Sequence, residues 1–362
     1  MRISLLLIMT FVFIGGQSAV KGYEIQTIAE DLNFPWCVAF LPNGEYLVSL
    51  RPGELRRITS QGDISDAIGN TPETYFASQG GYFDVLLDPD FEQNNTLYLA
   101  FAHGTPESNA TRIVKARLNA NTLEDVTPIF TATKKDTPVH YGGRMALLSD
   151  NTLILTVGDG FDYREAAQDT FSHLGKVIRV NTDGSVPSDN PFANGEKGDP
   201  KVYAYGLRNQ QGLALDAATN TLYLNEHGPQ GGDEVNIVSS GGNYGWPVTS
   251  YGINYSGAKV SPFETLPGIK EPIKYWTPSI AVSGMTFYTG AAFPEWQGDL
   301  LVGALIDKEV RRLELKDGAV VSEETLFQEI NQRIRDVRMG PDGMIYILTD
   351  SEKGKLLRVI PK

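Results

Sequence analysis

A turn followed by a short apolar run recurs six times along this chain, and that repeat limits the possible folds more than any other feature. Each copy places Asn, Asp or Gly at the turn and then Leu, Ile, Val or Tyr in the run, a pattern typical of β-hairpins. The copies are LPNGEYLVS around Gly44, QNNTLYLAF around Asn95, SDNTLILTVGD around Asn151, ATNTLYLNEHG around Asn220, WQGDLLVGAL around Gly298 and GPDGMIYILTD around Gly343. Six units of blade size predict an all-β fold, a six-bladed β-propeller, rather than a large β-sandwich.

The composition narrows the function classes. The formal net charge of -13 argues against a nucleic-acid partner, because phosphate binding needs clustered Lys and Arg. Hydrophobic residues make up 41% of the 362 residues, which is ordinary for a globular protein with a core. Cys37 is the only cysteine in the sequence, so no intrachain disulfide can form, and its apolar surroundings in FPWCVAF predict a packed core thiol.

The first residues have the pattern of a secretory signal peptide. Arg2 precedes an apolar run from Ile3 to Ile14 that is too short to cross a bilayer comfortably, and small residues follow with Ala19 as a cleavage point. A membrane anchor is the alternative, and the length of the run disfavours it. We therefore expect a signal peptide over residues 1–19, one propeller domain over residues 20–362, no stable membrane insertion, and a periplasmic or secreted mature protein.

Polar residues gather where the repeated strands meet turns. They occur in SQGGYFD, VHYGGRM, YGLRNQQGLAL and NQRIRDVR, and they include Gln79, His140, Arg208, Asn209, Arg333 and Arg335. Each one alone is explained equally well by a structural role. A propeller, however, brings such junctions together at one end of its channel, and a histidine among arginines, amides and glycine backbones suits a polyanionic ligand and a proton transfer.

The stretch NEHGPQGGDEVNIVSSGGNYGWP combines glycines and prolines with acidic and aromatic side chains. Asp233 and Glu234 are hard oxygen ligands, and the carbonyls of Gly228 and Pro229 are available where the chain turns. Calcium takes six to eight oxygens and accepts carbonyls readily, whereas zinc would need more His or Cys. A polar turn before a strand is the alternative interpretation of this segment.

Taken together and in order, HYGGR, GLRN-x-QG, NEHGPQGGDEVNIV, GGNYGWP, YGINYSG and RIRDVRMGPDG resemble the soluble aldose sugar dehydrogenases that depend on pyrroloquinoline quinone (PQQ), relatives of soluble glucose dehydrogenase. The resemblance covers essentially the whole chain after the signal peptide. It implies a six-bladed propeller, an aldose substrate oxidised to a lactone, PQQ and calcium as cofactors, and an electron acceptor that the sequence does not identify.

The resemblance also implies a role for each matching residue. His140 corresponds to the general base, Asp159 to the acid that orients it, and Arg208 to the arginine that stabilises charge on the quinone oxygen. The remaining matches are the cofactor contacts Gln79, Arg208, Asn209, Arg333 and Arg335, the carbonyl ligands of the cofactor calcium Gly228 and Pro229, and the second calcium site Glu234 and Tyr244. Tyr255 is expected near the pocket.

One position departs from the family pattern. Ile306, in GALIDKEV, stands where the family has a lysine that touches the cofactor, and Lys308 follows a turn-like Asp307. Gln210 replaces a proline in the same way, as a milder change. The departure at Ile306 keeps two alternatives open: an exported sugar-binding propeller without redox function, and a calcium-dependent hydrolytic propeller that no longer uses PQQ.

Overall fold

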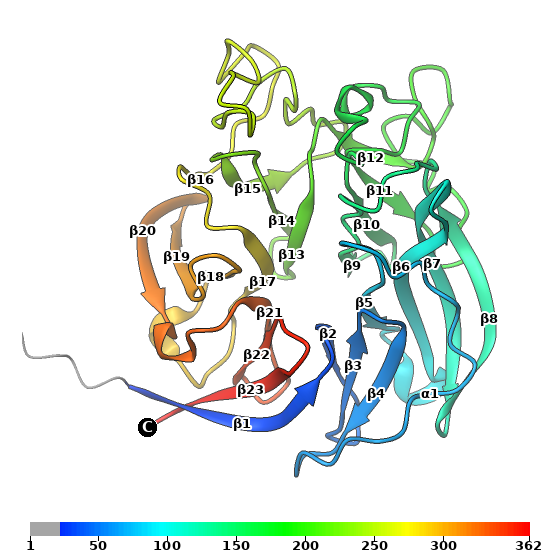
Figure 1. Cartoon of the computed structure of the whole chain (residues 1–362), viewed down its shortest axis with the longest axis vertical. Coiled ribbons are helices and arrows are strands. Elements are labelled where there is room, and N and C mark those ends of the chain that lie inside the picture. Colours follow the sequence, from blue (N-terminus) through cyan, green and yellow to red (C-terminus); the bar gives the residue numbers. More distant parts are fainter. Residues whose placement is uncertain (1–21) are drawn as a thin grey trace, which may run out of the picture.

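The six repeated turns each lie between the first and second strands of a separate β-sheet. The structure is a computed structural model that describes residues 22–362. Five sheets have four strands and one has three, and they are arranged around a common centre (Figure 1). The predicted six-bladed β-propeller is therefore confirmed. The expected signal peptide over residues 1–19 lies outside the described residues.

The strands follow the chain from blade to blade. The first blade contains β2 (Pro35–Phe40), β3 (Tyr46–Leu50) and β4 (Glu54–Ile58). The second contains β5 (Tyr82–Leu87), β6 (Thr96–Thr105), β7 (Ser108–Asn119) and β8 (Thr122–Thr131). The third contains β9 (Met145–Leu147), β10 (Leu153–Val157), β11 (Lys176–Val180) and β12 (Val202–Tyr205). The fourth blade contains β13 (Gln210–Asp216), β14 (Thr221–Glu226), β15 (Asp233–Val238) and β16 (Lys274–Trp276). The fifth contains β17 (Val282–Phe287), β18 (Leu300–Ala304), β19 (Val310–Lys316) and β20 (Ala319–Leu326). The last contains β21 (Ile334–Met339), β22 (Ile345–Thr349), β23 (Gly354–Pro361) and β1 (Tyr23–Leu32).

Helical structure is sparse in the described part of the chain. It comprises α1 (Phe91–Asn94) and the short 3₁₀ turns Arg164–Ala167, Pro294–Trp296 and Gln328–Ile330. The segment SEETLFQEI, which has some helical spacing, forms the end of β20 and one of these 3₁₀ turns. None of the helices in residues 22–362 is long and apolar enough to cross a membrane.

The repeat has a direct structural cause. All six turns place a residue in the left-handed region, where Gly and Asn meet little steric penalty. These residues are Gly44, Asn95, Asn151, Asn220, Gly298 and Gly343, with φ between 52° and 89°. Each turn joins an innermost strand to the second strand of the same blade. The innermost strands β2, β5, β9, β13, β17 and β21 each contact the next one around the ring.

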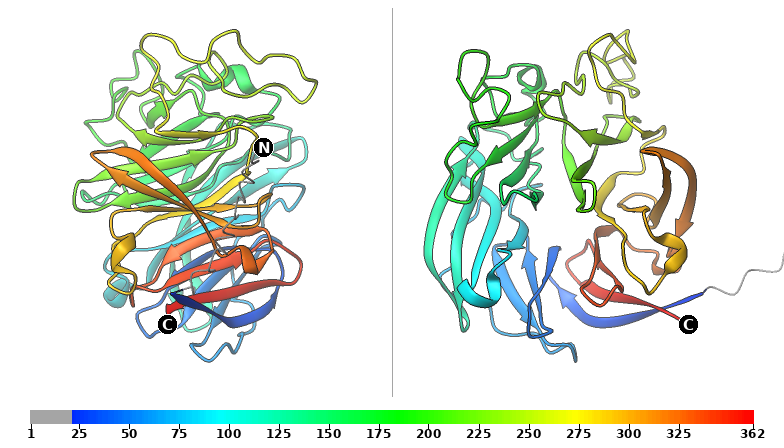
Figure 2. Two further views of the ribbon diagram at one scale, coloured as in Figure 1. Left: turned by 90° about the vertical axis from the view of Figure 1, so that its left-hand side faces the viewer. Right: turned by 180° about the vertical axis from the view of Figure 1, so that it is seen from behind.

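The ring closes by pairing the two ends of the described chain. The strand β1 runs antiparallel to β23, with Tyr23 opposite Pro361 and Ile25 opposite Val359, so the last blade takes its outer strand from the N-terminal side (Figures 1 and 2). This pairing covers the edge of β23 and holds the two ends of the described chain together in one sheet.

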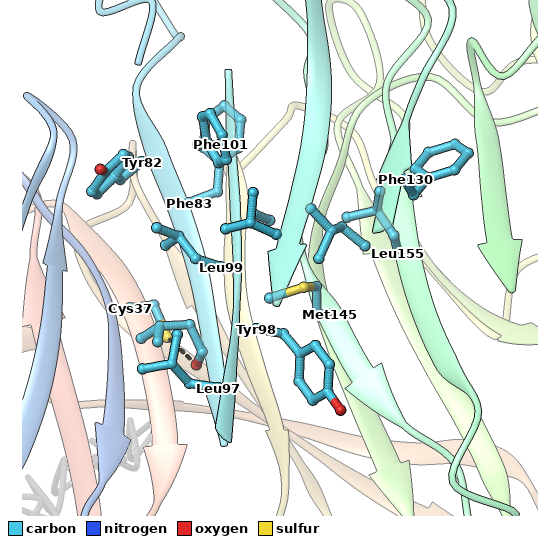
Figure 3. Packing of buried hydrophobic residues seen from close by; sticks show 14 of the residues in the cluster. Cys37, Tyr82, Phe83, Leu97, Tyr98, Leu99, Phe101, Phe130, Met145 and Leu155 are labelled. Atoms are coloured by element: carbon cyan, nitrogen blue, oxygen red, sulfur yellow. Dashed lines mark hydrogen bonds between the residues drawn. The ribbon is translucent and has the colours of Figure 1, made fainter. Parts of the chain in front are cut away.

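The core lies between neighbouring blades. Tyr82, Phe83, Leu99 and Met145 are almost completely buried where the first three blades pack together (Figure 3). Full burial of such side chains contributes about 1.5–3 kcal/mol each. Cys37 belongs to this cluster and its Sγ lies 3.6 Å from the backbone oxygen of Val85, so the predicted core thiol is confirmed.

Candidate functional site

Polar residues at one end of the channel occupy two kinds of segment in the blades: residues just before the innermost strand, and residues at the end of the second strand or just after it. Because these two strands are antiparallel, both segments lie at the same end of the channel, opposite the repeated turns. The first kind carries the predicted residues Gln79, His140, Arg208, Asn209 and Arg333. The second carries the predicted Asp159 and four residues that were not predicted: Arg51, Glu226, His227 and Asp350. Of the other predicted residues, Arg335 lies in β21, Glu234 in β15, and Gly228, Pro229 and Tyr244 in the loops on either side of β15.

A cationic cavity of about 170 Å³ opens at this end, and we call it the arginine cavity. Four of the predicted cofactor contacts line it, together with a further arginine that the sequence analysis did not select. The lining side chains are Gln79, Asn209, Gln211, Arg51, Arg333, Arg335 and Asp350 with the apolar Trp36, Phe83 and Leu305, among others. Three guanidinium groups therefore face a single carboxylate.

Asp350 holds two of these arginines. Its Oδ2 lies 3.0 Å from Arg333 Nε and 3.1 Å from Arg335 Nη2. Burial alone would raise the pKa of Asp350, but Arg335 and Arg333 lower it to about 2. The carboxylate is thus ionised at every physiological pH and neutralises one of the three positive charges, which leaves the cavity with an excess of two.

Arg51 supplies the third guanidinium. Burial, and then the positive charges of Arg335 and Arg333, lowers its pKa, and its Nε has no hydrogen-bond partner within residues 22–362. The guanidinium lies 5.4 Å and 5.6 Å from the ring centroids of Phe34 and Phe76. An incompletely paired cation among other cations is costly unless an anion occupies the cavity.

His140 and Asp159 form a hydrogen-bonded pair beside the arginine cavity. His140 Nδ1 lies 2.7 Å from Asp159 Oδ1, and Asp159 Oδ2 accepts a hydrogen bond of 2.7 Å from Trp246 Nε1. The backbone N–H of His140 donates to Gln79 Oε1 at 2.8 Å. The backbone of His140 packs closely against that of Gly158, and only glycine allows this, because a Cβ at position 158 would lie 2.4 Å from the backbone oxygen of His140.

The electrostatics of the pair favour a neutral, basic imidazole. Burial lowers the pKa of His140 and outweighs the opposing effect of Asp159, while Arg208 and Lys135 lower it further. Burial would raise the pKa of Asp159, but His140 and Arg208 bring it below its usual value. An ionised carboxylate only accepts, so Nδ1 carries the proton and Nε2 keeps a free lone pair.

Arg208 connects this pair to the glycine-rich loop. Its Nη1 donates to the backbone oxygen of Gly228 at 2.7 Å and to that of His227 at 3.1 Å, and its own backbone oxygen accepts from the N–H of Asp159 at 2.7 Å. Pro229 lines a neighbouring hollow together with Arg208. The Gly228 carbonyl, one of the two predicted to bind calcium, therefore lies next to the arginine and has one lone pair left for a cation.

A second, smaller cavity of about 30 Å³ lies under the loop, lined by Glu226, Glu234, Gly228 and Tyr244 among others. Burial, followed by repulsion from Glu234, raises the pKa of Glu226 well above its usual value. Burial likewise raises the pKa of Glu234 to about 7. A buried and a half-buried acidic group side by side are a donor set that a divalent cation would neutralise.

Asp233 has a different role from the one that its position next to Glu234 indicated. Its Oδ1 accepts from the backbone N–H of Gly228 at 2.9 Å, and its Oδ2 accepts from the N–H of Ala281 at 2.6 Å. It therefore fixes the loop to the next blade. No cluster of three or more His, Cys, Asp or Glu side chains suited to a metal occurs in residues 22–362, so a cation here would depend on carbonyl oxygens.

The segment around Ile306 places no cation in the arginine cavity. Leu305 lines the cavity, whereas the side chain of Ile306 is exposed. Lys308 is also exposed and is not among the lining residues, and Asp307 pairs with Arg311 at 2.8 Å. The positive charge expected from the family pattern is thus missing on this side, and Arg51 contributes one from another blade.

Among the residues that contact the candidate site, Arg51, Phe161 and Trp246 were not selected in the sequence analysis. Arg51 follows β3 directly, as Asp350 follows β22, so its position in the blade was the signal that could have identified it. Trp246 was noticed only as part of the glycine-rich stretch, and its bond to Asp159 joins residues 87 positions apart. The ring of Phe161 meets that of His140 edge-on, with centroids 5.2 Å apart.

Comparison with known proteins agrees with this geometry. Residues 32–358 match the family model of the glucose/sorbosone dehydrogenases. The chain belongs to this family. It is 39% identical over 346 residues to the aldose sugar dehydrogenase YliI of Escherichia coli, an alignment that covers 94% of this chain and 93% of that protein. The resemblance inferred from the ordered motifs is therefore confirmed.

Solved structures place this member of the glucose/sorbosone dehydrogenase family in the same fold group. The soluble aldose sugar dehydrogenase from Escherichia coli in its apo form has a TM-score of 0.90 at 38% identity, covering 94% of this chain and 100% of that chain. The PQQ-bound form of the aldose sugar dehydrogenase from Streptomyces coelicolor has a TM-score of 0.77 at 26% identity, covering 93% and 98%.

Proposed function

We propose that this protein is an exported quinoprotein that oxidises aldose sugars at the anomeric carbon to lactones. The observation that carries the proposal is the coincidence, at the same end of the channel, of a cavity with excess positive charge and a neutral histidine paired with an ionised aspartate. A hydrolase would instead need carboxylates and amides at this position. The electron acceptor is not identified, and the predicted location is periplasmic or secreted.

The arginine cavity fits PQQ, which is a flat polycarboxylate. Arg51, Arg333 and Arg335 would bind its carboxylates, since guanidinium groups match carboxylates in geometry and charge. Gln79 and Asn209 would supply amide contacts, and Trp36 an apolar wall. When bound, the quinone would serve as the acceptor of the hydride from the sugar.

In this proposal His140 is the general base. Its Nε2 removes the proton of the anomeric hydroxyl, and Asp159 stabilises the imidazolium that results and fixes its orientation. Arg208 places a positive charge beside the site where negative charge develops. Trp246 holds the carboxylate of Asp159 from the other side, so that the pair keeps its geometry while the proton moves.

Calcium would be held at two places. The carbonyls of Gly228 and Pro229 would bind an ion next to Arg208, where it would act as a Lewis acid. Glu234 and Tyr244, with Glu226, would bind a second ion that neutralises the buried carboxyl pair and stabilises the glycine-rich loop.

Reconstitution tests the proposal. The protein is purified without residues 1–19, and reduction of an artificial dye by glucose is followed with PQQ and calcium added singly and together. We expect reduction only with both, and its loss in His140→Ala. If PQQ neither binds nor supports reduction, the sugar-binding or hydrolytic alternative gains support, and hydrolysis of lactones without an electron acceptor then separates these two.

A further inference from the structure

Lys135 is a buried cation behind the His140–Asp159 pair, and the reaction described above does not use it. It lies in the segment that runs from the end of β8 to His140, and it is only 4% exposed. Lysine is almost never buried so completely unless its charge is paired. A buried ammonium group is costly when its surroundings do not compensate for it, so its contacts indicate what it holds in place.

Two oxygens and one aromatic ring hold the ammonium group of Lys135. Its Nζ donates to Asn109 Oδ1 at 3.1 Å and to the backbone oxygen of Thr137. It also lies 3.5 Å from the centroid of the Tyr141 ring, and the Tyr141 hydroxyl donates to the same Asn109 oxygen at 2.6 Å. Thr137 and Tyr141 stand on either side of His140 in the sequence, so Lys135 fixes the segment that carries the base.

The aliphatic stem of Lys135 packs against the loop that carries the acid. Gly160 follows Asp159 directly, and a Cβ at position 160 would lie 2.7 Å from Lys135 Cδ. The hydroxyl of Thr137 donates to the backbone oxygen of Gly160 at 2.7 Å, which joins the same two segments a second time. Lys135 therefore contacts both the segment before His140 and the loop after Asp159.

The charge of Lys135 also acts on the pair. Burial lowers the pKa of Lys135 to about 7, against the opposing effects of Asp159 and Asp136. The amine is therefore protonated over the pH range in which His140 titrates, because burial brings the pKa of His140 below its usual value, and Lys135 lowers it further. The other titratable groups that act on His140 or Asp159 are Arg208, His227, Lys176 and Glu226.

We propose that Lys135 is a positioning residue for the proton transfer: it fixes the loop of Asp159 against the segment of His140 and keeps a positive charge behind the pair. This charge favours the ionised carboxylate and opposes protonation of the imidazole, so the base remains neutral at a lower pH than it otherwise would. The inference rests on the proposed function for the role of His140 as the base. The contacts of Lys135 themselves involve only residues of this chain.

NMR titration of the histidine ring signals measures the pKa of His140 without PQQ or sugar. The chain has four histidines, and the signal that disappears in His140→Gln belongs to His140. Lys135→Met removes the charge and keeps the length of the side chain. Lys134→Met is the matched control, because it removes the same charge from the exposed neighbouring residue. Asn109→Asp is a second variant of unchanged shape, which places a negative charge against Lys135 Nζ and neutralises it.

We expect the pKa of His140 to rise by roughly 0.5–1 pH unit in Lys135→Met and in Asn109→Asp, because a nearby positive charge is removed or neutralised. Lys134→Met should leave this pKa unchanged. In the dye assay, the acid limb of the kcat/KM profile should move to higher pH by the same amount in Lys135→Met. A merely structural role for Lys135 would lower the melting temperature of the variant and leave the pKa of His140 where it is.

The outcomes separate this inference from the proposed function. If folded Lys135→Met keeps the wild-type pKa at His140, or if Lys134→Met shifts that pKa equally, the positioning role is refuted, and oxidation of glucose by the wild type still supports the dehydrogenase proposal. Should Lys135→Met fail to fold, an unchanged pKa in Asn109→Asp refutes the role in the same way. If the pKa shifts as expected but the wild type oxidises no sugar, the link between Lys135 and His140 stands and the dehydrogenase proposal fails.

Discussion

Replacing Arg51 by Gln removes one of three guanidinium groups from the arginine cavity. The cavity then holds Arg333 and Arg335 against Asp350, so its excess charge falls from two to one. A hydrogen bond to a charged partner contributes about 1.5–3 kcal/mol. We therefore expect the Kd for PQQ to rise roughly 10- to 100-fold, since each factor of ten corresponds to about 1.4 kcal/mol.

The same substitution should not destabilise the protein in the absence of PQQ. Arg51 is repelled by Arg335 and Arg333, and its Nε has no hydrogen-bond partner within the described residues. Release of this repulsion offsets the lost contacts with Phe34 and Phe76 and the lost hydrogen bond from Nη2 to the backbone oxygen of Ser78, so the melting temperature of the PQQ-free variant should equal or exceed that of the wild type. Opposite effects on binding and on stability are expected of a residue arranged for a ligand.

Quenching of tryptophan fluorescence during PQQ titration measures the Kd, because Trp36 lines the cavity. Arg56→Gln is the matched control, since Arg56 lies on β4 in the same blade and pairs with Glu54 at 2.7 Å outside the cavity. Arg51→Lys keeps the charge and should restore part of the affinity. The reasoning is refuted if Arg51→Gln binds PQQ as tightly as Arg56→Gln does, or if it unfolds at a clearly lower temperature without PQQ.

Three further predictions follow from buried polar groups. Burial lowers the pKa of His140, and a base acts when neutral, so kcat/KM should persist as the pH falls through the usual histidine value of about 6.5 and decline only below it; a decline above that pH would contradict the assignment. Calcium at one hundred times its Kd should stabilise the protein by about 2.7 kcal/mol, seen as a rise in melting temperature, and Glu234→Gln should abolish most of that rise; an unchanged rise would place the ion elsewhere. Gln210 is fully buried, and neither its Nε2 nor its Oε1 has a hydrogen-bond partner in residues 22–362. Gln210→Leu should therefore raise the free energy of unfolding, measured by urea titration, by about 1–2 kcal/mol. A loss of stability would instead indicate that a water molecule or an ion binds this side chain.

The fold was predictable because its signal is local and repeated. A turn at Asn or Gly and the strand after it can be recognised within ten residues, and the six copies agree with one another. The family motifs named His140 and Arg208 as site residues, and the structure places their side chains close enough to interact. Arg51 and Phe161 were missed because their importance depends on neighbours in other parts of the chain: Arg51 on the arginines of the last blade, and Phe161 on Tyr255 in a distant loop.

The structure also explains why a polyanion would bind at this end of the channel and not deeper. Below the arginine cavity, Arg144 lies 3.0 Å from Asp336 and Arg338 lies 2.8 Å from Asp84, so two guanidinium groups face two carboxylates and the floor carries no excess charge. Arg144 also donates to the backbone oxygen of Arg335 at 3.2 Å, which ties this neutral floor to the cationic cavity above it. The positive and negative side chains below the arginine cavity are thus equal in number, whereas the cavity itself has more positive than negative side chains. An anion is therefore attracted to the open end of the channel, and the hydrogen-bonded His140–Asp159 pair lies at that same end.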